Sequence, residues 1–432
     1  MSKAPLTDDY RETPLWWDDA RMPSLPRWRL PHETDVVVIG GGITGLAAAL
    51  HLARNGHQTV VIDKGVVGGG ASGRNAGMTH TGLRRPPAKL ISRYGIRGAE
   101  LHGASVDAYR YVAQLSREVA PQAGFDASGW LYLAHREKKM KRLRADEQSR
   151  REERGEVACV LDAEQVLEET RCAGFHGGLL TDNGAGMHPG HYLAGLTRAA
   201  LVAGVQVHER VAVTRVLQWP QRSRFSVNTT AGSILARQVL AATNGYTDRA
   251  LPALRRRVIP IGSYIIVTEP LGDALAEEIS PRRRMMTDTR NFLHYWRLTP
   301  DNRLLFGGRT SFVPVSLARA RDRLYRAMIA HYPRLHGVRL THAWSGNVGF
   351  TFDQLPHMGR IDGVTYAMGY CGSGVAMATW LGALAAAWIA EDGDQHRPPF
   401  ATLRFPTIPG YTGWPWFLPF AGLYYQLRDR FL

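Results

Sequence analysis

The most regular pattern of hydrophobic and polar positions lies between residues 35 and 63. A β-branched apolar run from Val36 to Ile39 meets a cluster of glycines. A run rich in alanine and leucine follows, and it leads into a second short apolar run from Thr59 to Ile62. Short β-branched runs bounded by glycine predict buried strands, and the longer run between them predicts a helix. We therefore expect one strand, helix and strand unit of a parallel sheet.

Three glycines lie at the turn between the first strand and the helix. Gly40, Gly42 and Gly45 have the spacing GxGxxG, and Asp63 closes the second strand. The first glycine permits a tight turn, the second lets the backbone approach a pyrophosphate, and the third lets helix and strand pack closely. The helix N-terminus offers N–H groups to phosphate, and an acid after the second strand suits a ribose hydroxyl. The unit predicts a dinucleotide site; the alternative is a glycine-rich turn in an ordinary α/β domain.

Two further glycine-rich loops fall where a parallel sheet places its ligands. Residues 68–85 are polar and glycine-rich directly after the expected ribose acid, and residues 369–374 join a strand at 364–368 to an apolar helix at 375–390. Residues 238–248 are also predicted to form a buried strand that ends in small polar residues. Loops at the carboxyl ends of parallel strands commonly bind the ligand, so all three segments are expected beside it.

A second β-rich region follows between residues 263 and 310. Apolar and polar residues alternate there, and the turn residues 300–302 separate two of the runs. This pattern is typical of an antiparallel sheet. Helical patterns lie at about 98–119 and 317–331, and a strand is expected at 129–134. The chain therefore alternates between a parallel-sheet domain and an antiparallel one.

Composition narrows the class of protein. The chain has 432 residues, 44% of them hydrophobic, which is enough for a large core in more than one domain. The net charge of +15 comes from scattered basic runs such as 138–144 and 255–257, and none of them carries a nucleic-acid-binding motif. We expect a solvated basic surface and no nucleic-acid partner. Electrostatic help for an anionic substrate is the other interpretation.

The N-terminal segment and the cysteines indicate the cellular compartment of the protein. The first thirty residues have no apolar run of the kind that a signal peptide needs, and their three tryptophans suit an arm that packs on the body. The apolar run 375–390 is shorter than the roughly twenty residues needed to span a bilayer. Cys159, Cys172 and Cys371 have no metal-like spacing. An odd number of cysteines without a signal favours a reducing compartment, so a cytoplasmic protein is expected.

The catalytic motifs of several large enzyme classes are missing from the sequence. There is no nucleophile elbow, no cluster of histidine and cysteine ligands for a metal, and no lysine signature for pyridoxal phosphate. The dinucleotide itself is then expected to supply the chemistry. Two glycine loops in addition to the first fit a large, enclosed FAD better than an exchangeable nicotinamide. We therefore predict non-covalently bound FAD and no metal.

The predicted fold class is α/β, or α+β overall, with a Rossmann-like FAD-binding domain interleaved with a mainly antiparallel-sheet substrate domain. The chain shows no internal repeat. The expected ranges are 1–30 for an N-terminal arm; 31–110, 181–255 and 343–395 for the FAD-binding domain; 111–180 and 256–342 for the substrate domain; and 396–432 for a C-terminal extension.

Several side chains are candidates for the substrate pocket, each with a structural alternative. His80 lines the pocket, tethers the flavin covalently, or is structural. Tyr295 and Trp296 form an aromatic wall for a cationic amine, or pack in the core. Arg309 binds an anionic group or forms a structural ion pair, and Asp353 contacts substrate or hydrogen-bonds within its loop.

With these residues in view, the chain resembles the D-amino-acid-oxidase-like family of FAD oxidoreductases, and most closely its γ-glutamylputrescine oxidase branch. The resemblance runs from about Pro14 to Leu432. It rests on a series of motifs in order, which are VIGGGITGLAAAL, GGGASGRNAG, LHYWRLTPDNRLLFGG, WSGNVGFTFDQLPHMGR, GYCGSGV and YYQLRDR.

The resemblance implies which residues bind FAD and face the flavin. The implied FAD-binding residues are Gly40, Gly42, Ile43, Thr44, Gly45, Asp63, Lys64, Ala71, Ser72, Arg74, Asn75, Gly77, Val211, Gly372, Ser373, Gly374 and Val375. The flavin-facing candidates for catalysis are His80, Tyr295, Phe350 and Ser373, and those for substrate binding are Trp296, Arg309 and Asp353.

The chain departs from the family pattern at the flavin end. Relatives that oxidise simple amino acids hold the substrate carboxylate with an arginine where this chain has Val348. The branch usually has histidine at the position of Ser373 and glycine at that of Ala76. Sarcosine-oxidase-like relatives have an oxygen-activating lysine near the position of Leu305. A larger amine is therefore expected as the substrate, in place of a plain α-amino acid.

We therefore predict an FAD-dependent oxidoreductase that oxidises the C–N bond of an amine, either γ-glutamylputrescine-like or another primary or secondary amine. A hydride passes to flavin N5, water hydrolyses the imine, and O2 or another acceptor takes the electrons. One alternative is an amino-acid or imino-acid dehydrogenase that feeds a membrane quinone through peripheral membrane contact, for which the basic charge and the aromatic tail 412–425 are the hints. The other alternative is an FAD-binding partner subunit without turnover.

Overall fold

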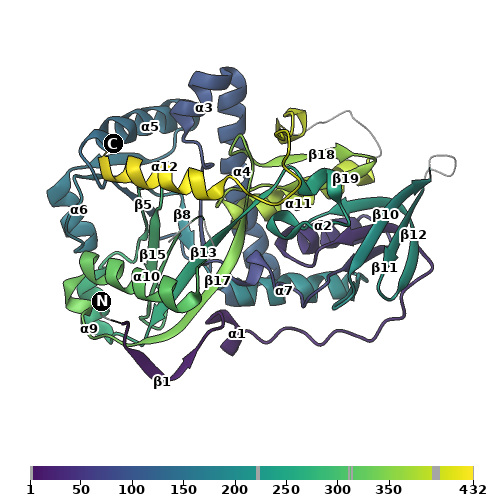
Figure 1. Cartoon of the computed structure of the whole chain (residues 1–432), viewed down its shortest axis with the longest axis horizontal. Coiled ribbons are helices and arrows are strands. Elements are labelled where there is room, and N and C mark those ends of the chain that lie inside the picture. Colours follow the sequence, from purple (N-terminus) through teal and green to yellow (C-terminus); the bar gives the residue numbers. More distant parts are fainter. Residues whose placement is uncertain (1–2, 220–223, 310–311, 313–314, 392–398, 432) are drawn as a thin grey trace.

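The computed structural model describes residues 3–219, 224–309, 312, 315–391 and 399–431. Within this part of the chain, the strands form two large sheets and one two-stranded ribbon. Figure 1 shows the two large sheets in the two halves of the molecule, with helices packed around both. Each sheet takes its strands from several separate stretches of the sequence, so the α/β architecture is interleaved as predicted.

The strand, helix and strand unit predicted at residues 35–63 is confirmed. Its elements are β2 (Glu33–Ile39), α2 (Ile43–Arg54) and β3 (Thr59–Ile62). The two strands pair in parallel. Val36 and Val38 pack into one hydrophobic cluster, and Val37 and Ile39 pack into another. Both faces of β2 are buried, which explains why its apolar run is continuous and does not alternate.

The parallel sheet continues on both sides of this unit. Its other strands are β9 (Gln206–His208), β10 (Val213–Trp219), β11 (Arg224–Thr229), β12 (Gly232–Ala241), β18 (His357–Ile361) and β19 (Val364–Met368). β12 lies between β2 and β19 and runs parallel to both. The carboxyl ends of these three strands therefore meet at one edge, where the loops that follow them are brought together.

Four helices cover one face of this sheet in a single hydrophobic cluster. Besides α2 they are α4 (Ile96–Val119), α7 (Pro189–Val202) and α11 (Gly374–Ala390). The helix expected at 375–390 is α11, and its small apolar side chains are buried almost all round. A helix of this composition is stable because it is surrounded by other elements.

The second sheet is mostly antiparallel. In spatial order its strands are β1 (Leu6–Arg11), β17 (Leu340–Phe350), β13 (Ile259–Thr268), β16 (Leu304–Gly308), β15 (His294–Leu298), β14 (Met285–Asp288), β5 (Trp130–Leu133), β7 (Gly178–Thr181) and β6 (Ala158–Leu161). The hairpin of β15 and β16 turns at residues 299–303, as the turn residues predicted. The third segment of the FAD-binding domain was expected to begin at residue 343, which lies within β17 of this antiparallel sheet. The domain ranges stay a prediction.

Helices cover one face of the antiparallel sheet, and the other face looks toward the parallel sheet. The remaining elements are α3 (Pro87–Tyr94), α5 (Lys138–Arg154), α6 (Ala163–Thr170), α8 (Pro252–Arg255), α9 (Asp273–Ile279), α10 (Leu317–His331), and the ribbon of β4 (Met78–His80) with β8 (Gly184–Gly186). Successive side chains of β16 point to the two opposite faces of this sheet. Leu304 and Phe306 pack with α10 in the core, and Leu305 between them packs with Trp344 on the other side.

The N-terminal arm is more regular than the sequence pattern predicted. β1 adds a parallel strand to β17, and α1 (Trp16–Asp19) follows it. Trp16 is buried against Trp344, and its indole N–H donates to the carbonyl of Asn75 at 2.8 Å. Trp17 is more exposed, but the guanidinium of Arg74 lies over its ring at 4.9 Å from the centroid. The expectation that the tryptophans pack on the body therefore holds for Trp16 and Trp17, whereas Trp28 is exposed.

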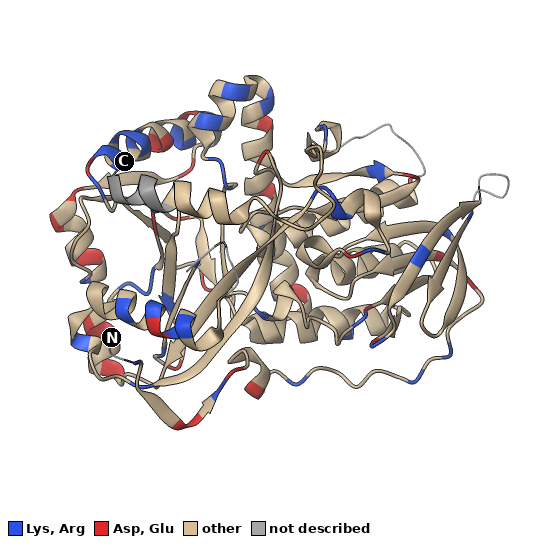
Figure 2. Cartoon of the chain, viewed as in Figure 1, with Lys and Arg blue, Asp and Glu red and all other residues tan. Residues whose placement is uncertain are grey.

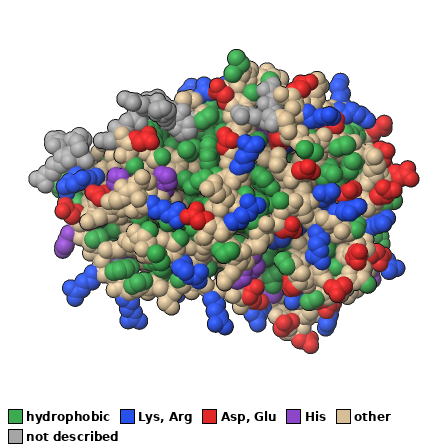
Figure 3. All heavy atoms as spheres, turned by 180° about the vertical axis from the view of Figure 1, so that it is seen from behind, with side chains coloured by type: hydrophobic (Ala, Val, Ile, Leu, Met, Phe, Trp, Pro, Cys, Tyr) green, Lys and Arg blue, Asp and Glu red, His purple; other side chains and the backbone are tan. Residues whose placement is uncertain are grey.

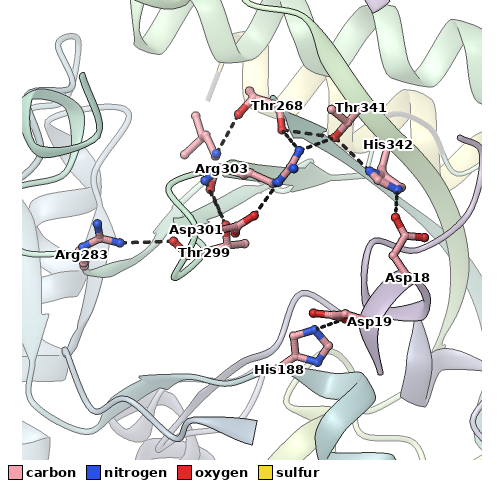
Figure 4. Close-up of polar contacts among 11 residues, drawn as sticks. Asp18, Asp19, His188, Thr268, Arg283, Thr299, Asp301, Arg303, Thr341 and His342 are labelled. Atoms are coloured by element: carbon pink, nitrogen blue, oxygen red, sulfur yellow. Dashed lines mark hydrogen bonds and ion pairs between the residues drawn. The ribbon is translucent and has the colours of Figure 1, made fainter. Parts of the chain in front are cut away.

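Polar contacts connect α1 to both halves of the molecule, as Figure 4 shows. The Asp18 carboxylate lies 3.0 Å from Nε2 of His342 on β17, and the Asp19 carboxylate lies 3.1 Å from Nε2 of His188, directly before α7. Because β17 belongs to the antiparallel sheet and α7 packs on the parallel one, the arm holds the two sheets in a fixed relation.

The aromatic tail forms a helix that the sequence pattern did not predict, α12 (Leu418–Phe431). Leu418 is buried, whereas Phe420, Leu423 and Tyr424 are exposed on the outer side. Among the residues that the structure describes, no helix is both long enough and apolar enough to cross a bilayer. Cys159, Cys172 and Cys371 are all free thiols.

Charged side chains are distributed over the whole surface. Figure 2 shows lysine and arginine on elements in both halves, with a concentration along α5. On the opposite face, Figure 3 shows basic and acidic side chains interspersed with apolar ones. The described residues of that face therefore form no continuous basic stripe of the kind that follows a nucleic-acid backbone.

Candidate cofactor and substrate site

A cavity of about 1030 Å³ is lined by residues of both sheets. One part of its wall is the carboxyl edge of β2, β3 and β12 with the loops that follow them. Another part is the face of β13, β15 and β17 that the covering helices leave open. The two glycine-rich loops predicted to flank the ligand both reach it, since residues 68–72 and 370–374 are part of its lining.

The glycine turn before α2 has no room for side chains. Gly40 has φ +111°, a value that favours glycine, and a Cβ on Gly42 would lie 2.7 Å from Oγ of Ser72. A Cβ on Gly45 would lie 1.9 Å from the carbonyl oxygen of Gly40, which is inside van der Waals contact. The backbone at the start of α2 therefore faces the cavity directly, and a helix N-terminus of this kind offers N–H groups to an anion, apart from that of Ile43, which is bonded within the protein.

The carboxylate of Asp63 is fixed at the end of β3. One oxygen accepts from the N–H of Gly41 and the other from the N–H of Gly65, both at 2.7 Å. Each carboxylate oxygen keeps a second lone pair, and Asp63 lines the cavity. The residue is thus placed to accept a hydroxyl group of a bound ligand, as the sequence predicted for a ribose.

The loop after β3 is held by its own polar side chains. Oγ of Ser72 accepts from the N–H of Ile43 at 3.0 Å, which joins the loop to the start of α2. Nε of Arg74 donates to Gly69, and Asn75 accepts from the N–H of Gly77 through its side-chain oxygen. The abundance of small and polar residues here supplies the bonds that a loop without regular structure needs.

The second loop places another helix N-terminus beside the first. Gly369 donates its N–H to the side-chain oxygen of Asn244 at 2.9 Å, and Gly372 has φ +112° before α11 begins at Gly374. The hydroxyl groups of Tyr370 and Thr44 are 2.7 Å apart, so the starts of α2 and α11 are close neighbours. Two sets of helical N–H groups therefore border one cavity.

Nearly all residues implied to bind FAD line the cavity. The exceptions are Gly45 and Gly77, which stand behind the lining. A Cβ on Gly77 would lie 2.0 Å from the carbonyl oxygen of Met187. These two glycines permit close packing of the loops that do line the cavity. A dinucleotide fits this donor set, since the glycine turn, the helix N-termini and the carboxylate of Asp63 correspond to its pyrophosphate and ribose.

The flavin-facing candidates are brought together, although they are far apart in the sequence. His80, Tyr295, Phe350, Ser373 and the substrate candidate Arg309 all line the cavity. The hydroxyl of Tyr295 lies 3.0 Å from that of Ser263, and burial raises the pKa of Tyr295 to about 12. Tyr295 is therefore a neutral phenol at physiological pH, able to donate or accept a hydrogen bond but not to act as a phenolate base.

His80 is also neutral near pH 7. Burial lowers the pKa of its imidazole to about 4, against the smaller opposing effect of the Thr81 carbonyl. Its Nδ1 lies 2.7 Å from that carbonyl and 3.1 Å from the hydroxyl of Tyr132. Its ring packs against Trp130 at 4.3 Å between centroids. The side chain is a rigid wall of the cavity with Nδ1 as the donor, and it offers a neutral polar group.

Two substrate candidates lie outside the cavity lining. Trp296 is fully buried on the opposite face of β15, where its indole N–H donates to the hydroxyl of Tyr332 at 3.0 Å. Asp353 accepts from Thr351 and from the N–H of Leu355, and it pairs with His357 at 3.0 Å. Trp296 therefore packs in the core, and Asp353 forms hydrogen bonds within its loop, which are the structural alternatives given above for these two residues.

Several cavity residues were not among the candidates. Tyr246 accepts the N–H of Asn347 at 3.0 Å and packs over Gly70, and Ser263, Tyr132 and Arg84 also reach the cavity. The segment 238–248 was expected to end beside the ligand, which was the available signal for Tyr246 and Asn244. Ser263 and Tyr132 had no such signal, because only strand pairing decides which face of each strand they occupy.

The fold and this site together define a dinucleotide-dependent oxidoreductase with a substrate chamber against an antiparallel sheet. The FAD dependent oxidoreductase (DAO) family model matches residues 35–388, and the chain belongs to that family. It therefore uses FAD, with the cavity described above as the place that fits it.

Curated relatives match over almost the whole chain. It is 32% identical to γ-glutamylputrescine oxidoreductase of Escherichia coli K12, over 92% of this chain and 93% of the relative. It is also 32% identical to the probable oxidoreductase OrdL of Rhizobium meliloti, over 96% and 97%. These matches confirm the resemblance drawn from the motifs.

Solved structures agree on the fold. Glycine oxidase from Geobacillus kaustophilus superposes with a TM-score of 0.72 at 22% identity, covering 87% of this chain and 99% of that one. L-amino acid deaminase from Proteus vulgaris gives 0.73 at 15% identity, covering 89% and 100%. At these identities the likeness concerns the fold alone.

Proposed function

We propose that the protein oxidises the C–N bond of an amine larger than a simple α-amino acid. The observation that carries the proposal is the cavity wall on the antiparallel sheet, where Val348 and Phe350 of β17 and Tyr295 of β15 present an apolar and aromatic surface. The resemblance implies that Val348 stands where family members that act on simple amino acids carry an arginine. The similarity to γ-glutamylputrescine oxidoreductase supports the same substrate class.

FAD, when bound, would supply the acceptor for the hydride that leaves the substrate carbon, and O2 or another acceptor would take the two electrons. The residues for holding it are the glycine turn at 40–45, Asp63, Ser72 and the loop 370–374. The amine loses a hydride from carbon and a proton from nitrogen, and the resulting imine takes up water to give a carbonyl compound and a smaller amine or ammonia.

The side chains of the chamber favour the neutral form of the amine, which is the form that can lose a hydride. An alkylammonium with a lysine-like pKa lies about three units above neutral pH, so its deprotonation costs about 4 kcal/mol. Removal from water lowers that pKa and reduces the cost. Tyr295 and His80 are neutral and add no negative charge that would oppose this effect.

Anaerobic reduction of the bound flavin tests the proposed function. The holoenzyme is mixed with a panel of alkylamines, γ-glutamylated amines and α-amino acids, and the flavin absorbance near 450 nm (roughly, a property of the cofactor) is followed. We expect bleaching by one or more amines and its reversal by an electron acceptor. Bleaching by α-amino acids alone would contradict the proposal and the weight given to Val348. A fully loaded flavoprotein that no compound bleaches would favour the partner subunit without turnover.

A membrane quinone is a second candidate for the electron acceptor, because the tail exposes a row of large apolar side chains. Trp414 is 71% and Phe420 73% exposed, and Leu423 and Tyr424 lie near them. Ala421 and Tyr425 of the same helix line the cavity, so α12 separates the cavity from an apolar surface. Tryptophan and tyrosine favour the membrane interface, and the basic helix α5 also borders the cavity.

Vesicle binding and acceptor choice test this second candidate together. We expect the holoenzyme to sediment with vesicles that contain anionic phosphatidylglycerol, and to reduce a quinone faster than O2 with the same amine. Serine at both Phe420 and Leu423 is expected to weaken vesicle binding about tenfold or more, because two apolar side chains no longer leave water. Val202→Ser, which changes an exposed apolar residue on α7, is the matched control. Equal sedimentation of both variants would contradict a membrane-binding role for α12.

A further inference from the structure

Two arginines at the substrate end of the cavity have no acidic partner among the described residues. Arg84 lies in the loop between β4 and α3, and Arg309 directly follows β16. Both line the cavity. Arg309 is only 8% exposed, and its guanidinium lies over the ring of Phe350 at 4.6 Å from the centroid. Within the described part of the chain, no hydrogen bond or ion pair joins either guanidinium to another residue.

The other arginines of the cavity lining are different in this respect. Each of them has a fixed partner. Arg74 donates to the carbonyl of Gly69, Arg85 to that of Asp353, Arg142 pairs with Asp146, Arg150 with Glu156, and Arg290 with Asp288. These contacts fix loops and helices. The unpaired state of Arg84 and Arg309 is therefore a property of this pair and not of the arginine-rich composition.

The charge of Arg84 also acts on Arg309. Burial and the charge of Arg84 lower the pKa of Arg309 to about 9, and burial and Arg142 lower the pKa of Arg84. Like charges removed from water are unfavourable unless an anion lies between or beside them. The residues that the structure describes do not supply that anion, since the carboxylate that acts on Arg84, Asp288, is bound to Arg290.

We propose that Arg84 and Arg309 form a subsite for a carboxylate that the amine substrate carries apart from the carbon that is oxidised. The proposal rests on the proposed function, because it assigns part of that substrate. A planar guanidinium binds a carboxylate through two parallel N–H donors, and two guanidiniums together hold one carboxylate from two sides. The N-terminus of α2 would hold the pyrophosphate of the cofactor, so a second phosphate site is not required here.

The location of this subsite determines which end of the substrate carries the carboxylate. Val348 and Phe350 of β17 are apolar, so the carboxylate is not held by that strand as an α-amino acid would be in the family members described above. It is held from β16 and from the loop after β4. The amine that fits has its carboxylate separated from the reacting C–N bond by an apolar spacer, which packs against Tyr295 and Phe350.

Binding of glutarate to the resting holoenzyme tests the subsite without any turnover. Calorimetric titration is compared for glutarate, for its neutral diamide glutaramide and for inorganic phosphate. We expect glutarate to bind at least tenfold more tightly than either of the others. Arg309→Gln and Arg84→Gln are each expected to weaken glutarate tenfold to a hundredfold, the range for a hydrogen bond to a charged group. Arg309→Lys keeps the positive charge, so we expect it to lose less glutarate affinity than Arg309→Gln.

Arg144→Gln is the matched control. Arg144 is exposed on α5 and lies outside the cavity lining, so its substitution removes the same charge at a distance from the proposed subsite. It should leave glutarate affinity within twofold of wild type. FAD content of each variant shows whether it has folded.

Equal binding of glutarate and glutaramide, or wild-type affinity in both glutamine variants, would overturn the subsite. Tighter binding of phosphate than of glutarate would overturn the proposed carboxylate subsite and indicate that the two arginines bind a phosphate group. If Arg309→Gln does not fold, the comparison of glutarate with glutaramide and the Arg84→Gln variant still decide the question. A holoenzyme that binds glutarate but is bleached by no amine keeps the subsite and refutes the proposed function, so the two failures are distinguishable.

Discussion

Alanine at Gly45 is expected to give a protein that purifies without its yellow cofactor. The new Cβ would lie 1.9 Å from the carbonyl oxygen of Gly40 and 3.1 Å from the side chain of Val38. Neither neighbour can move away, because Gly40 is tied to β3 through its N–H at 2.8 Å from the carbonyl of Ile62. The helix α2 must therefore shift outward, and its N–H groups leave the pyrophosphate position. We expect FAD affinity to fall by at least a hundredfold, which corresponds to about 3 kcal/mol.

Fluorescence titration of the apoprotein with FAD measures this loss. Gly56→Ala is the control, since Gly56 has φ +83° at the end of the same helix but a Cβ added there would have no neighbouring atom within 4 Å. It should cost about 1 kcal/mol of stability from backbone strain and leave FAD affinity unchanged. Gly45→Ala with wild-type FAD affinity would show that helix and strand at this turn are not packed as described.

Glutamine at Glu156 is expected to cause the largest loss of stability among single polar substitutions near the cavity. Glu156 is 5% exposed and accepts from His102 at 2.6 Å, and from Arg150 and Asn183 at 3.1 Å each. A neutral amide leaves Arg150, itself buried, without a counter-ion. Removing one partner of a buried ion pair typically costs about 3–5 kcal/mol. Thermal unfolding of the holoenzyme should therefore begin several degrees lower.

The pH dependence of that loss has a defined sign. Burial alone would raise the pKa of Glu156, but the hydrogen bond from His102 and the charge of Arg150 hold it at about 2. The folded pKa is lower than the unfolded one, so the stabilisation is present above about pH 4.5 and is lost as pH falls toward 2. The difference between wild type and Glu156→Gln should shrink over that interval. Glu152→Gln, an exposed change on α5, is the control, and an equal effect of both would refute a buried network at Glu156.

The position of Glu156 also links stability to the cavity. Its carboxylate accepts from the hydroxyl of Thr81 at 2.5 Å, and the carbonyl of Thr81 accepts from Nδ1 of His80. Loss of the network is thus expected to loosen His80, which lines the cavity. The sequence offered no sign of this arrangement, because Thr81, His102 and Glu156 come from three segments that only the folded chain brings together.

Much of the cofactor end could be predicted from the sequence because its determinants are local. The run of Val36 to Ile39 specifies a strand buried on both faces, and the glycines 40–45 specify a turn without side chains. The whole unit extends over fewer than thirty residues, so the spacing along the chain is close to the spacing in space. The same holds for the helix at 317–331, whose bounds agree with α10.

The substrate end could be predicted only in part. Tyr295 and Trp296 are adjacent and equally suited to either role, yet one lines the cavity and the other lies in the core. Alternation along a strand guarantees that they point to opposite faces, but the pairing of β15 with β14 and β16 decides which face is which. The strand β1 and the helix α12 were missed for a related reason, since their partners are distant in the sequence.

The sequence by itself therefore determined the class of cofactor, the glycine turn that approaches it, and the family, because each depends on short motifs whose geometry is set within a few residues. Only the tertiary structure decided the content of the substrate chamber. Arg84 and Arg309 are unpaired cations in one cavity of the described chain because a loop after β4 and the end of β16 meet there. Such a meeting depends on the packing of two sheets against each other, and no local pattern along the chain records it.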